Sequence, residues 1–118
     1  YINSFAIPAG ELKHGPIALI EDGTFLTAIA TQDHLYDKML SNIQEVKARG
    51  AYVIGVAKES NKLIEHQADK VIYIPDCIDE VTPILSIVPL QLLAYYIAVM
   101  RGCDVDKPKN LAKSVTVE

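Results

Sequence analysis

Three runs of almost entirely apolar residues are spaced along this chain, with amphipathic or polar segments between them. The runs cover residues 25–30 (FLTAIA), 51–57 (AYVIGVA) and 71–74 (VIYI). Their length and their partly β-branched composition predict β-strands. Because apolar residues fill consecutive rather than alternating positions, both faces of each strand are expected to be covered, as in a parallel sheet.

A longer segment, residues 33–49, repeats its apolar residues at helical spacing. Steps of four and three residues place one set of side chains on a single face: Leu35, Met39, Ile43 and Val46. Asp33 is a typical helix start signal, and a basic last turn followed by Gly50 is a typical stop signal. The pattern predicts a helix over 33–49.

The segment between the second and third predicted strands is short and polar at its start. Ser60 or Asn61 is expected to cap a short helix over residues 62–67, because both side chains can accept a hydrogen bond from the first turn. Leu63 and Ile64 are expected to face the interior of the protein.

Residues 79–101 form the longest apolar segment, and Gly102 follows it. The length suits a membrane span. However, Pro83 and Pro89 interrupt the segment, and acidic residues precede it. A helix that is apolar nearly all round is equally expected inside a protein or at a subunit interface. We predict a helix of this second kind and no membrane association.

The predicted order of strand, helix, strand, short helix, strand and helix is typical of an α/β fold with a parallel sheet. Three strands make a thin sheet, so we expect further strands and helices before Tyr1. We divide the chain into a domain portion, 1–103, and a C-terminal tail, 104–118.

The overall charge narrows the classes of partner. The chain has 118 residues, half of them hydrophobic, and a formal net charge of −4. That composition is ordinary for one globular domain. A net negative charge argues against nucleic-acid binding, because no surplus of basic residues exists to displace counterions from phosphates.

Metal binding is not indicated by the sequence. Cys77 and Cys103 are far apart and form no C-x-x-C motif, so we expect two reduced thiols in a cytoplasmic protein. Asp104 and Asp106 resemble the start of a calcium loop, but the downstream glycine and glutamate are missing. We therefore predict no metal site.

A glycine-flanked stretch near the start, residues 10–16 (GELKHGP), has the glycine spacing of a phosphate-binding P-loop. That motif requires Lys and then Ser or Thr directly after the second glycine. Pro16 and Ile17 stand there instead. The stretch is therefore not expected to bind a nucleotide.

The same turn brings Glu11, Lys13 and His14 close together in sequence. A histidine in this setting can transfer protons near neutral pH. A solvated or structural histidine is the ordinary alternative, and the residues alone leave both open. His34 and His66 lie on predicted helix surfaces without convergent neighbours, and we assign them no role.

The tail carries a second candidate, Lys113, among the apolar residues Leu111, Ala112 and Val115. If the tail docks, burial would lower the pKa of this lysine by disfavouring its ammonium form. A neutral amine is what Schiff-base chemistry with a keto sugar requires. A solvated lysine on a frayed tail is the ordinary alternative.

Two stretches at opposite ends of the chain, GELKHGPIALIE (10–21) and PLQLLAYYIAVMRGCDVDKPKNLAKSVTVE (89–118), closely resemble the isomerising glutamine–fructose-6-phosphate transaminases. The C-terminal half of that family contains two sugar isomerase (SIS) domains of flavodoxin-like α/β topology. The resemblance implies that this chain corresponds to the later part of the second SIS domain and the terminal tail.

The resemblance also implies roles for individual residues. His14 matches the histidine that helps to open the sugar ring in the neighbouring subunit of a homodimer. Lys113 matches the lysine that forms a Schiff base with fructose 6-phosphate, and Ala112 lies beside it in the substrate-binding tail. The implied reaction converts fructose 6-phosphate and glutamine to glucosamine 6-phosphate and glutamate in amino sugar biosynthesis, without a cofactor and in the cytoplasm.

Other parts of the family's machinery match no position in this sequence. The glutamate that moves a proton between C1 and C2 precedes the position of Tyr1, and the phosphate-binding loop belongs to the preceding SIS domain. Phe5 stands where many relatives carry an acidic residue. We therefore expect the 118-residue piece alone to be inactive. The alternatives are a non-catalytic SIS module for phosphosugar binding or dimerisation, and a fructosamine-phosphate deglycase.

Overall fold

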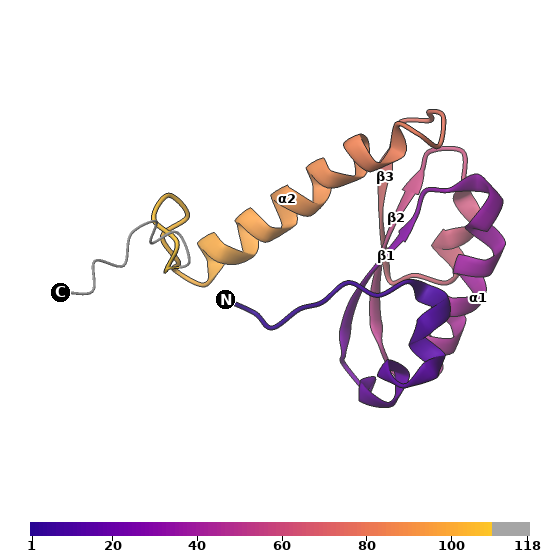
Figure 1. Ribbon diagram of the computed structural model, residues 1–118, viewed down its shortest axis with the longest axis horizontal. Coiled ribbons are helices and arrows are strands. Elements are labelled where there is room, and N and C mark those ends of the chain that lie inside the picture. The colour runs from indigo at the N-terminus through magenta and orange to yellow at the C-terminus, as the bar shows by residue number, and fades with distance from the viewer. Residues whose placement is uncertain (110–118) are drawn as a thin grey trace.

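A parallel three-stranded sheet forms the centre of the computed structural model, which describes residues 1–109 (Figure 1). Its strands lie in the order β1-β2-β3. They are β1 (Phe25–Ala30), β2 (Tyr52–Lys58) and β3 (Lys70–Ile74). The three predicted strands, their parallel arrangement and the α/β class are confirmed, with each strand boundary within one residue of the prediction.

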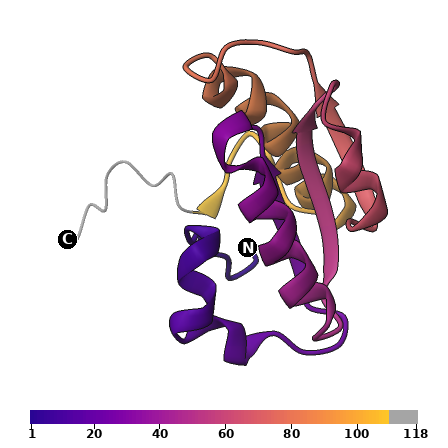
Figure 2. The same cartoon turned by 90° about the vertical axis from the view of Figure 1, so that its right-hand side faces the viewer.

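Helices lie on both sides of this sheet. The α-helices are α1 (Tyr36–Lys47) and α2 (Thr82–Met100), and the short 3-10 helices are η1 (Ala9–His14), η2 (Pro16–Leu19), η3 (Asp33–Leu35) and η4 (Lys62–His66). Figures 1 and 2 show α1 on one side of the sheet and α2 on the other. The 3-10 helix η1 lies beside α1.

The hydrophobic core lies between the sheet and α1. Alternate residues of a strand point to opposite faces, so one set from each strand meets the helix. The buried members are Ala28, Ala30, Leu40, Ile43, Val46, Val53, Ala57 and Ile64. This single layer of packing gives α1 its position and encloses η4 at one side.

The buried face of α1 agrees with the predicted one in the second half of the helix only. Ile43 and Val46 are buried as predicted, whereas the predicted Leu35 is exposed and the predicted Met39 is half-buried. Tyr36 and Leu40 are buried instead. The Tyr36 hydroxyl donates a hydrogen bond to the carbonyl of Asn61 at 2.9 Å and accepts one from the Ile64 amide at 3.0 Å, so its polar tip is satisfied in this inward position.

The predicted caps are also wrong in detail. No side chain caps η4; the Ser60 hydroxyl donates to Asp76 instead, and the Asn61 side-chain amide donates to Asp33. Ile64 is fully buried as predicted, but Leu63 is 59% exposed. Asp33 likewise starts η3 rather than an α-helix, because its carboxylate binds other side chains.

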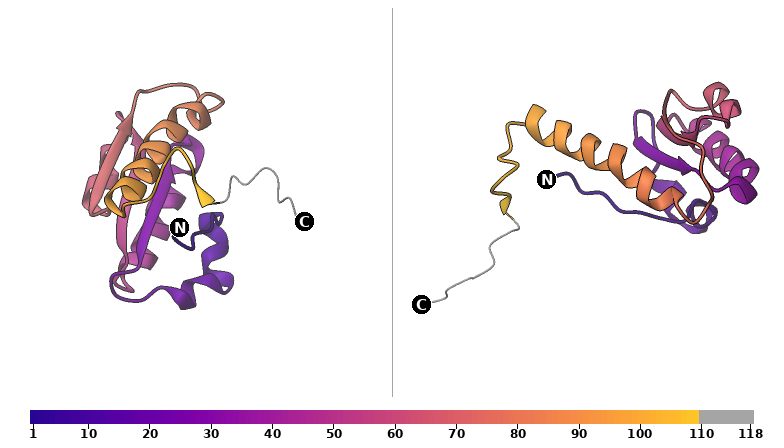
Figure 3. Two further views of the ribbon diagram at one scale, coloured as in Figure 1. Left: turned by 90° about the vertical axis from the view of Figure 1, so that its left-hand side faces the viewer. Right: turned by 90° about the horizontal axis from the view of Figure 1, so that it is seen from above.

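The long apolar segment forms α2, which begins three residues later than predicted. Figure 3 shows the helix extending well beyond the sheet. Within it only Thr82 and Ser86 are buried. By length and composition alone, α2 is the one helix in residues 1–109 suited to crossing a membrane. The same apolar surface is expected of a helix that packs against another protein layer.

The sheet face turned away from α1 is partly open. Phe25 and Tyr52 stack on this face with ring centroids 6.2 Å apart, yet both remain about half exposed, as does Ile29. Aromatic and β-branched residues at consecutive strand positions are typical of strands covered on both faces. The face therefore has the composition of an interior surface.

Candidate active site

His14 is the last residue of η1, and the backbone turns sharply after it. Gly15 has φ of 152° and ψ of −57°, in a region that residues with a β-carbon rarely adopt. Pro16 then starts η2 at a position where its fixed φ is favourable. The glycine-flanked stretch is therefore a turn between two short helices, in agreement with the sequence.

The turn is fixed to the domain from one side only. Leu12 and Ile20 pack against the core, while Glu11, Lys13 and His14 are exposed. Within residues 1–109, the imidazole of His14 makes no hydrogen bond or ion pair. The segment thus presents a histidine without a partner among residues 1–109 to the surroundings of the domain.

The second predicted site lies outside the described residues. Ala112 and Lys113 both belong to the last nine positions, so their predicted roles remain predictions. The chain leading to them is described: Gly102 ends α2 with φ of 67°, and the Asp104 carboxylate accepts the amides of Asp106 and Lys107. The structure therefore gives the starting direction of the tail only.

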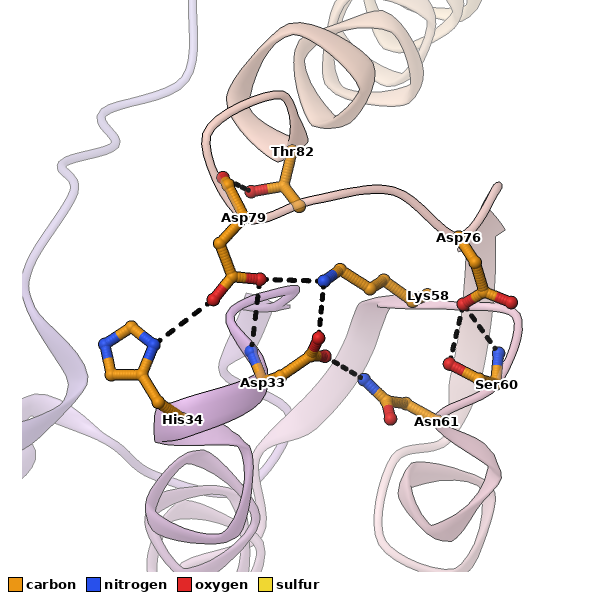
Figure 4. A network of polar contacts seen from close by, with 8 residues as sticks. All are labelled: Asp33, His34, Lys58, Ser60, Asn61, Asp76, Asp79 and Thr82. Carbon is orange, nitrogen blue, oxygen red and sulfur yellow. Dashed lines mark hydrogen bonds and ion pairs between the residues drawn. The ribbon is translucent and has the colours of Figure 1, made fainter.

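A cluster that the sequence analysis missed lies where the strands end. Lys58, the last residue of β2, is 2% exposed. Its ammonium donates to the Asp33 carboxylate at 2.8 Å and to the Asp79 carboxylate at 2.7 Å (Figure 4). Asp33 follows β1 and Asp79 follows β3. The cation therefore joins the three connections that leave the carboxyl edge of the sheet.

His34 belongs to the same cluster, contrary to the expectation that nothing converges on it. Its Nδ1 lies 3.2 Å from the second carboxylate oxygen of Asp79. His66 has no such partner within the described part of the chain. The signal that could have revealed the cluster is a charged residue within five positions after each predicted strand, because parallel strands bring those positions to one edge.

The charges in the cluster stabilise one another. The hydrogen bonds that the Lys58 ammonium donates to Asp33 and then to Asp79 raise the pKa of Lys58 far above its ordinary value, because they outweigh desolvation. The Lys58 ammonium in turn lowers the pKa of Asp79. A lysine held permanently charged cannot act as a nucleophile or base. Because two carboxylates already bind it, Lys58 is also a poor ligand for an added phosphate.

No cofactor or metal is indicated elsewhere in the described residues. Residues 1–109 contain no group of three or more His, Cys, Asp and Glu side chains suited to a metal ion. Cys77 and Cys103 are not joined to each other. His14 and the Lys58 cluster make no contact. Within residues 1–109 the candidate site therefore consists of the exposed His14, and Lys113 lies outside the described residues.

Comparison with known proteins decides the family. The family model of the SIS domain matches residues 1–101. This chain belongs to the SIS domain family. Within the SIS family, it is 68% identical over all 118 residues to the glutamine–fructose-6-phosphate aminotransferase (isomerizing) of Caldanaerobacter subterraneus, and 59% identical to that of Clostridium acetobutylicum. It spans 19% of the length of each of these curated relatives.

A solved SIS structure is similar in three dimensions. The C-terminal domain of glucosamine-fructose-6-phosphate aminotransferase from Francisella tularensis superposes with a TM-score of 0.77 at 38% identity. The match covers 86% of this chain and 29% of that one. The resemblance stated from the two end motifs is thereby confirmed, and the chain matches the C-terminal isomerase part of these enzymes.

Proposed function

We propose that the protein carrying this chain converts fructose 6-phosphate and glutamine to glucosamine 6-phosphate and glutamate. The observation that carries the proposal is identity of 68% along the whole chain, tail included, to a relative named for this aminotransferase activity. Such identity spans both GELKHGP and NLAKSVTVE, the two segments that contain chemically useful side chains. Because the chain is a small share of that relative, the complete reaction remains a proposal.

His14 is proposed to assist opening of the sugar ring. Ring opening needs a proton removed from the anomeric hydroxyl and one delivered to the ring oxygen, and imidazole does both near neutral pH. The exposed, unpaired position of His14 at the end of η1 supports a site formed with another subunit.

Lys113 is proposed to form an imine with the open-chain sugar. Its amine would add to the C2 carbonyl of fructose 6-phosphate and release water. Ammonia would then displace the lysine from C2. A residue that the chain does not contain would move the proton between C1 and C2. Ala112, directly before Lys113, is proposed to contact the substrate.

The partner of this chain is proposed to be a second copy. The surface of α2 that its own domain leaves exposed is almost wholly apolar: Ile84, Ile87, Val88, Leu92, Tyr95, Tyr96, Val99 and Met100. Monomeric soluble proteins rarely expose so large an apolar surface. Two-fold contacts between identical subunits are the commonest solution. The proposal involves no cofactor, nucleic acid or membrane. We also propose that the protein is cytoplasmic.

The rival function, a regulatory SIS module that only binds a phosphosugar, is disfavoured by Lys113 in the tail segment NLAKSVTVE. A module that only binds its ligand needs affinity but no amine that forms an imine.

The family match ends at residue 101. This supports the proposed division into a domain portion, 1–103, and an active-site tail, 104–118.

Reductive trapping tests the proposed chemistry. The protein carrying this chain is incubated with fructose 6-phosphate and borohydride. The peptides of a proteolytic digest are then analysed by mass spectrometry. The proposal predicts a sugar adduct on Lys113 and its loss in Lys113→Met. Binding of fructose 6-phosphate without an adduct at Lys113 would instead support the regulatory module.

A further inference from the structure

One buried cation ties the start of α2 to the sheet. Lys58 donates to Asp79, which lies in the connection just before α2, and to Asp33 after β1. The backbone carbonyl of Asp79 accepts a hydrogen bond of 2.8 Å from the hydroxyl of Thr82, the first residue of α2. Figure 4 shows these contacts together. An unbroken chain of polar contacts thus leads from the end of β2 into the first turn of α2.

The apolar contact between α2 and the sheet lies along the first half of the helix. The groove between the helix and β3 is lined by Ile74, Leu85 and Pro89 among others. Further along the helix most side chains are exposed, and Figure 3 shows it passing beyond the sheet. A helix of 19 residues is about 28 Å long. A tilt of about 10° at its start therefore moves its far end by about 5 Å.

We propose that Lys58 is a positioning residue which, through Asp79, fixes the direction in which α2 leaves the sheet. Charge-assisted hydrogen bonds depend on geometry, because the ammonium must meet both carboxylates at once. Apolar contacts are not directional in this way. The Lys58 side chain is 2% exposed, and the Asp79 and Asp33 side chains are 31% and 63% exposed, so salt and water screen the contact with Asp79 less than the contact with Asp33. Asp33, bound to the same ammonium, anchors the other side of the contact.

The consequence for activity rests on the proposed function. The tail follows α2 in sequence, so the direction of α2 sets where the chain after Met100 starts toward the substrate. A misplaced amine at Lys113 would slow imine formation, and a displacement of about 1 Å can cost roughly 100-fold in rate. We expect kcat to fall roughly 10- to 100-fold in Lys58→Met. The KM for fructose 6-phosphate should change less than about twofold, because the family resemblance assigns the phosphate-binding loop to the preceding SIS domain.

The direction of α2 can be measured without reference to activity. Spin labels are placed at Lys38→Cys on α1 and at Met100→Cys, where the native side chain is 85% exposed. Cys77 and Cys103 are first replaced by serine, and labelled protein is diluted with unlabelled protein. Pulsed electron paramagnetic resonance then measures the distribution of distances between the two labels within one chain. We expect Lys58→Met to shift or broaden this distribution by several ångströms.

A matched control removes a similar ion pair that does not touch α2. Lys47 lies 2.7 Å from both carboxylate oxygens of Asp69, so Lys47→Met disrupts a pair of comparable geometry. It should leave the α1–α2 distance distribution unchanged. Equal distributions in Lys58→Met and in the unsubstituted protein would overturn the positioning role.

A second variant keeps the test decisive if Lys58→Met does not fold. Asp79→Asn preserves the shape of a side chain that is 31% exposed and removes its charge, and we expect the same shift. An unchanged distribution there also overturns the proposal. A shifted distance with normal kcat would refute the link between α2 and the tail. Absence of any activity in the unsubstituted protein would refute the proposed function, while the distance measurement still decides the role of Lys58.

Discussion

Gly55 and Ile64 are in such close contact that no side chain fits between them. A β-carbon at Gly55, in the middle of β2, would lie 2.5 Å from Cδ1 of Ile64. Ile64 is fully buried in η4, and its amide is bound by the hydroxyl of Tyr36. Because the side chain of Ile64 is fully buried, Cδ1 can move away only by displacing its neighbours in the core. This contact determines how closely η4 approaches the sheet.

Gly55→Ala is accordingly expected to destabilise the protein by about 1–3 kcal/mol, the usual cost of adding a methyl group to a packed core. Thermal unfolding should show a lower melting temperature. Gly10→Ala is the control, because a β-carbon there meets no atom within 4 Å and should change the melting temperature little. An equal melting temperature for Gly55→Ala and the parent would contradict the packing described.

Acid sensitivity should depend on Asp69. Hydrogen bonds from Lys47 and then from the Val53 amide lower the pKa of this carboxyl below its ordinary value of 3.8. The folded state then binds fewer protons than the unfolded state, so the contribution to stability is complete above the ordinary pKa and is lost as the pH falls through the lowered one. We expect the melting temperature of Asp69→Asn to decline less steeply between about pH 5 and pH 3.

The control for this experiment is Asp106→Asn, at an exposed carboxylate without a hydrogen-bonding partner among residues 1–109. Its melting temperature should follow the same acid profile as that of the parent. If Asp69→Asn also retains the full acid dependence, the ion pair with Lys47 does not contribute as described.

Much of the fold could be predicted because it depends on local patterns. Continuous apolar runs identified the three strands, and Gly50 marked the end of α1, where its φ is 87°. Ile43 and Val46 were predicted to face inward, but the burial of Tyr36 at the start of α1 could not be predicted, because a tyrosine ranks as only intermediate in burial until its hydroxyl finds partners. Those partners, near residues 61 and 64, are distant in sequence.

The candidate site was only partly predictable for a similar reason. His14 stands out through its glycine-flanked motif, and the structure shows it exposed at the turn between η1 and η2. The Lys58 cluster depends on charges from three separate connections: Asp33, Lys58 and Asp79. Each charge looks like an ordinary surface residue in the sequence. Only the parallel arrangement of the strands brings these three residues together. Their burial and pairing can therefore be seen in the folded structure but not in the sequence.

His14 can be tested with another histidine of this chain as its control. His14→Ala in the complete enzyme should lower glucosamine 6-phosphate formation by roughly 100- to 10,000-fold, the usual contribution of an acid–base group. Because its side chain is exposed, the melting temperature should stay unchanged. His66→Ala, also at an exposed histidine, should retain full activity. Equal rates for both variants would exclude a catalytic role for His14.

The isolated 118-residue piece should form no glucosamine 6-phosphate. It lacks the proton-transfer glutamate and the phosphate-binding loop that the family resemblance assigns to other segments. The measurement is product formation from fructose 6-phosphate and ammonia, with the complete enzyme as the positive control. Turnover by the piece alone would show that the residues in this chain suffice.

The central claim is that this chain contributes His14 and Lys113 to active sites of different subunits. Purified His14→Ala and Lys113→Met enzymes, each inactive, are mixed, dissociated and reassociated, and glucosamine 6-phosphate formation is measured. If His14 acts across the dimer, each hybrid has one intact site, and random reassociation restores about a quarter of the parental activity. If both residues serve the same subunit, every hybrid site is defective. Absence of any recovered activity would then contradict the account.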